Sequence, residues 1–168
     1  MKRKNIIASA VACGAFAGLL ATLPALADST PAPSAHAAMV EKGSQEVMPF
    51  DLKRTMHIFE PTTDGGVQIV MVHDGDPVQI ALVRSHLRKE AASFGRGDFS
   101  DPAEIHGMNM PGLAQLRAGA KRIAISYAAT SNGAIIRYKT SDPGLIAAIH
   151  KWFAAQVKDH GAHARMAH

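Results

Sequence analysis

The chain has 168 residues, a formal net charge of +4 and nine histidines. Three of its cations, Lys2, Arg3 and Lys4, lie at the N-terminus, and without residues 1–27 the net charge is about +1 (15 Lys and Arg against 14 Asp and Glu). The remaining chain has no basic run or basic face, which excludes a nucleic-acid-binding surface. It also lacks cysteine, because Cys13 is the only one, and this excludes disulfides, thiolate zinc sites and a cysteine nucleophile.

Residues 1–27 have the pattern of an export signal. A positively charged start is followed by an apolar run from Ile6 to Leu23, and Ala25-Leu26-Ala27 forms a small-x-small cleavage site. Pro24 interrupts the apolar run, which favours a cleaved signal over an anchor. No other apolar run approaches the roughly 20 residues that a membrane span requires. We therefore expect a periplasmic or secreted protein with no membrane span after cleavage.

The mature chain divides into three parts by composition. Residues 28–47 are rich in Ala, Pro and Ser and have no hydrophobic period, which predicts a disordered tether. Residues 48–160 have the length and hydrophobic pattern of a single α+β domain. Residues 161–168 form a histidine-containing tail, and such tails often bind metals.

An internal duplication is visible within the domain. Residues 55–72 and 121–139 each read as strand, glycine turn and strand, and each predicted hairpin is followed by Asp-Pro. Asp is a good N-cap and Pro suits the first helical position, so helices are predicted over 77–94 and 143–158. The expected fold is a pair of ββα units that form a four-stranded, mainly antiparallel sheet with two helices on one face.

The linker between the two units contains His106-Gly107-Met108-Asn109-Met110. We expect His106 to lie in a loop between two short helices, where functional sites often occur. Imidazole and thioether groups together suit copper better than zinc, because thioether is a soft ligand. The same residues are also compatible with ordinary turn and packing chemistry.

Further histidines are candidates for the same site. On the first predicted helix His86 and Glu90 are four residues apart and share a face, so they are either two ligands, an acid–base pair or a surface ion pair. His150 lies beside the apolar stripe of the second helix, where a backbone-bonded histidine is as plausible as a ligand. His160 follows at the C-terminal end of that helix. The candidate ligand set is therefore His86, His106, Met110, His150, His160, Met108 and Glu90.

Several segments resemble a small exported bacterial family whose members often carry the name aspartate carbamoyltransferase. The similar segments are Gln79-Ile80-Ala81-Leu82-Val83-Arg84-Ser85-His86-Leu87, Gly97-Asp98-Phe99-Ser100-Asp101-Pro102, Ile105-His106-Gly107, Met110-Pro111-Gly112-Leu113, His150-Lys151-Trp152-Phe153 and Asp159-His160-Gly161. The Ser-Thr-Arg-Thr and His-Pro-Thr-Gln motifs of carbamoyltransferases are absent, and the family has no established activity. The resemblance implies that His86, His106, Met110, His150 and His160 lie in its recurring segments.

Three functions remain open on the sequence. The first is a metal-binding protein with copper favoured over zinc. The second is a small enzyme with an acid–base or metal-assisted site at His86 with Glu90, or at His106 with Glu104; no nucleophile elbow, phosphate loop or His-Glu-x-x-His motif supports it. The third is a non-catalytic binding or homodimerisation module that meets its partner through a sheet edge or an open sheet face.

Overall fold

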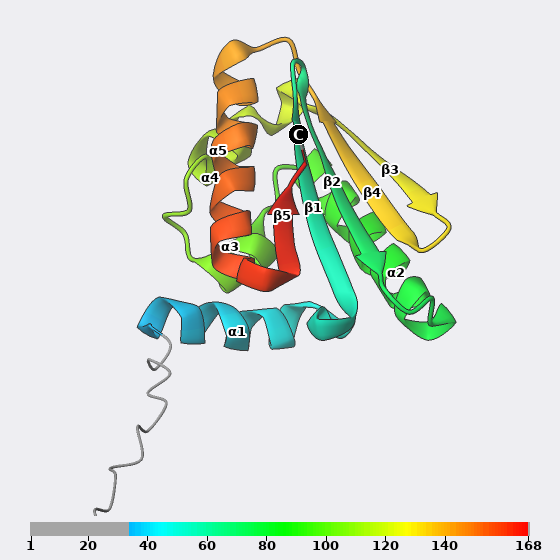
Figure 1. Cartoon of the computed structure of the whole chain (residues 1–168). Coiled ribbons are helices and arrows are strands. Elements are labelled where there is room, and N and C mark those ends of the chain that lie inside the picture. The colour runs from blue at the N-terminus through cyan, green and yellow to red at the C-terminus, as the bar shows by residue number, and fades with distance from the viewer. Residues whose placement is uncertain (1–33, 168) are drawn as a thin grey trace, which may run out of the picture. The chain divides into compact units, whose positions relative to one another are not determined.

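A five-stranded mixed sheet, in the order β3-β4-β2-β1-β5, carries the helices of an α+β fold (Figure 1). The structure is a computed structural model, and it describes residues 34–167. The predicted export signal of residues 1–27 lies outside the described residues. The strands are β1 (Thr55–Thr62), β2 (Gly65–Val72), β3 (Ala124–Thr130), β4 (Gly133–Lys139) and β5 (Ala164–Met166). The helices are α1 (Ala35–Val47), α2 (Pro77–Gly95), α3 (Ser100–His106), α4 (Leu113–Gly119) and α5 (Pro143–His160).

Both predicted hairpins and both predicted long helices are present. In each unit the aspartate before the helix accepts hydrogen bonds from the second and third helical N–H groups, at 2.7 and 3.1 Å for Asp76 and at 2.8 and 3.3 Å for Asp142. A cap of this kind stabilises a helix by about 1 kcal/mol. Among the described residues no helix has both the length and the apolar character needed to cross a membrane.

The prediction of four strands is wrong, because the C-terminal tail adds a fifth. Strand β5 pairs with β1 in parallel, with Ala164 opposite His57, and the N–H of Ala167 donates to the carbonyl oxygen of Phe59 at 2.8 Å. Residues 161–168 lack the alternating pattern that identifies a strand. Only the free edge of β1, which offers unpaired backbone groups, makes this short segment extended.

The disordered tether predicted for residues 28–47 is also wrong for its second half. Residues 35–47 form helix α1, which Ser34 caps by accepting from the N–H of Ala37. Helix α1 lies across the end of the domain where α3 and the last turn of α5 meet (Figure 1). Its close approach depends on Gly43, because a Cβ at that position would meet the backbone of Ile105. Composition alone does not reveal such a contact.

The hydrophobic core lies on one face of the sheet. Directly opposite residues of paired strands share a face, so Phe59, Val70 and Ile136 project to the same side. Residues from both long helices, among them Leu87 of α2 and Trp152 of α5, pack into the same buried cluster. The two helices therefore cover the same face.

The pairing of β2 with β4 relates the two halves of the chain. Pro77 and Pro143 begin the long helices, and Ile69 on β2 lies opposite Ile135 on β4. Both pairs are 66 positions apart (143 − 77 and 135 − 69). The hairpin turns do not share this offset, because Gly65 and Gly133, which follow the two turns, are 68 positions apart (133 − 65), so superposition of the whole units stays a prediction.

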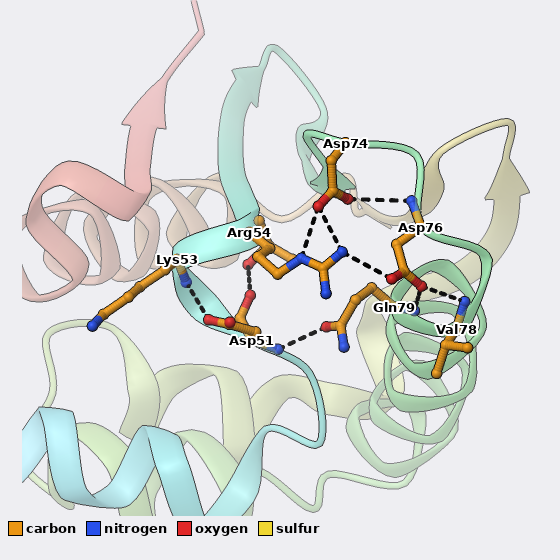
Figure 2. A network of polar contacts seen from close by, with 8 residues as sticks. Asp51, Lys53, Arg54, Asp74, Asp76, Val78 and Gln79 are labelled. Atoms are coloured by element: carbon orange, nitrogen blue, oxygen red, sulfur yellow. Dashed lines mark hydrogen bonds and ion pairs between the residues drawn. The ribbon is translucent and has the colours of Figure 1, made fainter.

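A polar network fixes the start of α2 against the start of β1 (Figure 2). The guanidinium of Arg54 donates to Asp74 at 2.8 Å and to the helix-capping Asp76 at 2.8 Å. The N–H of Asp51 donates to the side-chain oxygen of Gln79 at 2.8 Å. The network lies at the surface, so its role is to position α2, which carries two residues of the site described next.

A buried histidine cavity

A partly open cavity of about 30 Å³ lies between the sheet and the helices. One water molecule requires about 10–15 Å³ of this kind of volume, so the cavity has room for about two. Ligand pockets for drug-sized molecules are at least ten times larger. The polar residues that line it are His57, Gln68, His86, Glu90, His106, Trp152 and Gln156.

Helices α5 and α2 and strand β1 bring most of these side chains together. On α5, Trp152, Gln156 and His160 follow each other at intervals of four residues, and all three are buried. On α2, His86 and Glu90 have the same spacing. His57 reaches the site from the core face of β1, where it is 3% exposed.

The sequence predicted that His106 lies in a loop. This is wrong, because His106 is the last residue of α3. The chain leaves the helix at Gly107, whose φ of 89° favours glycine. The Nδ1 atom of His106 lies 2.9 Å from Oδ2 of Asp159, and the Nε2 atom of His36 lies 3.0 Å from the other oxygen. Because a carboxylate only accepts, Nδ1 of His106 carries the proton and Nε2 has a free lone pair.

The ring of His160 lies between two other imidazoles. Its centroid is 5.2 Å from that of His57 and 4.8 Å from that of His106. The His106–His160 pair is edge-to-face, at 89°. Three histidines from β1, α3 and α5 thus form one buried group, which we call the histidine cluster.

Six buried polar atoms around this site have no hydrogen-bond partner within residues 34–167. They are Nε2 of His57, His106 and His160, Oε1 of Glu90, Nε1 of Trp152 and Nε2 of Gln156. An unpaired buried polar atom costs about 1–3 kcal/mol. Six together would cost about as much as the whole stability of an ordinary domain. These atoms therefore require polar partners, and a cavity with room for about two water molecules can supply them.

The imidazoles of the site are neutral at pH 7. Burial lowers the pKa of His86 and of His160 to about 4. Burial also lowers the pKa of His57 well below its usual range, and the neighbouring His160 adds to the effect. For His106 burial lowers the pKa although the Asp159 carboxylate opposes it. Neutral imidazoles expose lone pairs, which is the form that binds metals.

Glu90 has the opposite shift. Burial, followed by the nearby Asp101 carboxyl group, raises the pKa of Glu90 to about 8. The side chain is consequently a neutral carboxylic acid at pH 7, with its proton shared with the Asp101 carboxylate and Oε1 left as an acceptor. The cavity therefore combines neutral acceptors at the histidine cluster and Glu90 with the N–H donors of Trp152 and Gln156.

The structure separates the predicted site residues into two groups. His86, Glu90 and His106 line the cavity, and His160 packs against its wall. The expected approach of His86 to His106 within roughly 5 Å stays a prediction. His150 lies elsewhere on α5, where its Nε2 contacts the carbonyl oxygens of Thr62 and Gly65 at 3.1 and 2.9 Å.

Neither methionine of the linker lines the cavity. Met108 is 61% exposed, and its sulfur accepts from Arg117 at 3.7 Å. Met110 is buried among the apolar side chains of the core. The thioether groups that favoured copper are thus in solvent and in the hydrophobic core, because the chain turns away from the cavity directly after Gly107.

Sequence reasoning missed three residues of the site. His57 reads as ordinary polarity near a strand end, and Trp152 as part of an apolar helix stripe. Gln156 was not among the predicted site residues. The available signal was the spacing of Trp152, Gln156 and His160, which places two polar groups on the buried stripe of α5.

Within residues 34–167, no three His, Cys, Asp or Glu side chains are arranged so that they could hold one metal ion. The histidine cluster is accordingly not a preformed coordination site. No protein family, curated protein or solved structure matches the chain.

Proposed function

We propose that the protein binds one transition-metal ion through the histidine cluster, His57, His106 and His160. The observation that carries this proposal is that all three Nε2 atoms are buried and lack a partner in the described part of the chain. Imidazole nitrogen is a common ligand of zinc and copper, and it binds in the neutral form that burial favours here.

The spacing of two of the three ring pairs supports the proposal. A metal about 2.0–2.1 Å from two imidazole nitrogens in tetrahedral geometry places the two ring centroids about 5 Å apart. The His57–His160 and His106–His160 centroids are 5.2 and 4.8 Å apart. The nitrogens are not yet gathered around one point, so binding requires the imidazoles to turn within their positions.

Asp159 supplies the partner that metal-bound histidines commonly have. A carboxylate that accepts from the remote ring N–H orients the ligand and makes it a better donor. Asp159 does this for His106 at 2.9 Å. The carboxylate has no second role in the core, since its other oxygen contacts the half-exposed His36.

The ligand set changes the reason for preferring copper. With nitrogen ligands only, divalent copper binds more tightly than zinc because copper lies at the maximum of the Irving–Williams order. Met108 and Met110 are not part of the proposed site. Copper(II) first and zinc second is therefore the expected order of affinity.

The test is a competition titration of untagged, chelator-treated protein with Cu(II) and with Zn(II). We expect one ion per chain. His106→Ala and His160→Ala should each weaken binding by more than about 100-fold, since loss of a second-shell partner alone costs about 10–100-fold. His150→Ala is the matched control, because it removes a histidine from the same helix and should leave affinity unchanged. Met110→Leu should leave Cu(II) affinity unchanged as well.

Two results would contradict the proposal. One is the absence of stoichiometric binding in the wild-type protein. The other is an equal loss of affinity in His150→Ala and in His160→Ala, which would assign the metal to scattered surface histidines. Circular dichroism of each variant establishes that the fold is retained.

A second candidate is acid–base chemistry at the same cavity. His106 and Glu90 both line it, and their environments push their pKa values in opposite directions. A neutral imidazole oriented by a carboxylate is a suitable general base, and a protonated carboxyl group is a suitable general acid. The measurement is the ¹³C chemical shift of the Glu90 carboxyl carbon against pH. A midpoint near its ordinary value would remove this candidate without affecting the metal proposal.

A further inference from the structure

The face of the sheet opposite the core carries a second set of apolar side chains. Residues alternate between faces along a strand, so Ile58, Ile69 and Ile135 project away from the side occupied by Phe59 and Ile136. Ile69 and Ile135 are partly exposed, whereas Ile58 is 8% exposed and Val67 beside them is 5% exposed; none of the four is part of the buried cluster on the core face. Helices α2 and α5 both cover the opposite face. We call the apolar set the open face; it consists of Met56, Ile58, Val67, Ile69, Met71 and Ile135.

Two residues of opposite charge lie at matching positions on either side of β2, whereas Arg165 on β5, opposite Ile58, has Ala128 on β3 as its counterpart. Glu60, Val67 and Arg137 form one row across β1, β2 and β4, with β2 in the centre. Both charged side chains are exposed, and neither forms an ion pair within the described residues. Each lies one strand away from Val67, on opposite sides.

The next two rows have the same centre. Ile58, Ile69 and Ile135 form the second row, again with β2 in the middle. Met56, Met71 and Gly133 form the third row. Met56 on β1 and Gly133 on β4, which has no side chain, lie at equal distances from β2 on opposite sides.

We infer that the open face binds a second copy of this chain, through a two-fold axis that runs along β2 between two facing sheets. Such an axis exchanges β1 of one copy with β4 of the other. Glu60 then faces Arg137 of the second copy, twice, and Met56 faces the gap above Gly133. Ile69 and Met71 each face their own counterpart. Aligned sheets pack in this way about 10 Å apart and within about 30° of each other.

The size of the face predicts a weak dimer. Three strands about 4.8 Å apart and about 24 Å long give a footprint of roughly 350 Å² per copy. The total of roughly 700 Å² is below that of stable interfaces and is typical of a weak, transient dimer. A dissociation constant in the micromolar range is therefore expected.

Sedimentation velocity of the purified protein, from about 1 µM to about 300 µM, tests the inference because this range spans the expected constant. The wild-type protein should shift from monomer to dimer. Ile69→Lys should abolish the dimer, because the two lysines would face each other at the axis. Val78→Lys is the matched control on α2, where Val78 is 63% exposed, and should leave the dimer intact.

A charge exchange separates this geometry from other modes of association. Glu60→Arg and Arg137→Glu should each weaken the dimer by about 10-fold or more, since each places like charges opposite one another. Combining both changes in one chain, or mixing the two single variants, should restore it. A monomeric wild-type protein at all concentrations would overturn the inference, and so would failure of the combined variant to recover. Neither result bears on metal binding, which concerns the other face of the sheet.

Discussion

Asp159 accepts a hydrogen bond from Nδ1 of His106 at 2.9 Å, and this contact decides which ring nitrogen is left for the cavity. The two residues are 53 positions apart in sequence and come from α3 and α5. Burial opposes ionisation of Asp159, yet hydrogen bonds from His36 and His106 hold the pKa of its carboxyl group below the usual value. The carboxylate is therefore charged at neutral pH and able to orient the imidazole.

Asp159→Asn should weaken metal binding by about 10–100-fold, because an amide can hold the other tautomer of His106 and turn its lone pair away. The competition titration described for the wild-type protein measures this. His36→Ala is the control, since it removes the other partner of Asp159 and leaves His106 in place. Equal losses in the two variants would show that Asp159 holds α1 rather than the ligand.

Glu90→Gln should stabilise the protein more at pH 8 than at pH 5. In the folded state the pKa of Glu90 is about 8 against an ordinary 4.5, so between these values the folded state retains a proton that the unfolded state has released. Stability is therefore lost as the pH rises through this window, on the order of a few kcal/mol in full. Glutamine has no proton to lose. Urea denaturation at the two pH values measures the difference, and a pH-independent effect would contradict the assignment.

The histidines should make the protein sensitive to acid. The pKa of His86 is about 4 in the folded state against an ordinary 6.5, so the unfolded state takes up a proton first as the pH falls. Stability contributed by the neutral form is present above pH 6.5 and is lost between 6.5 and about 4, on the order of 2–3 kcal/mol for this residue. His86→Gln should reduce the slope of unfolding free energy against pH in that interval. An unchanged slope would mean that His86 is solvated in the folded protein.

Gly112→Ala should destabilise the fold by more than about 2 kcal/mol, a large effect for one methyl group. Gly112 has a φ of 83°, and a Cβ there would collide with the carbonyl oxygen of Ala148 on α5. Gly75→Ala isolates the conformational part of the cost, about 1 kcal/mol, because its φ is 70° and no atom lies within 4 Å of a Cβ. Thermal denaturation of both variants gives the comparison. Equal losses would show that α4 can move away from α5.

Local sequence signals were sufficient to predict the local structure. Both hairpins follow from glycine turns between apolar strands, and both long helices follow from Asp-Pro caps with an apolar stripe. These signals act within a few residues, so they do not depend on the rest of the chain. The same holds for His86 and Glu90, because helical periodicity alone places residues four apart on one face of the helix.

Which of these residues form a site depends on how the elements pack together. His57 becomes part of the histidine cluster because the core face of β1 lies against the last turn of α5, and His150 is excluded because its turn of α5 faces the β1–β2 hairpin. Met110 is lost to the core because its side chain is more stable among apolar groups than beside a polar cavity. Strand β5 forms because β1 has a free edge. Each of these outcomes depends on contacts between segments far apart in sequence, and burial, not local propensity, supplies the energy that selects them.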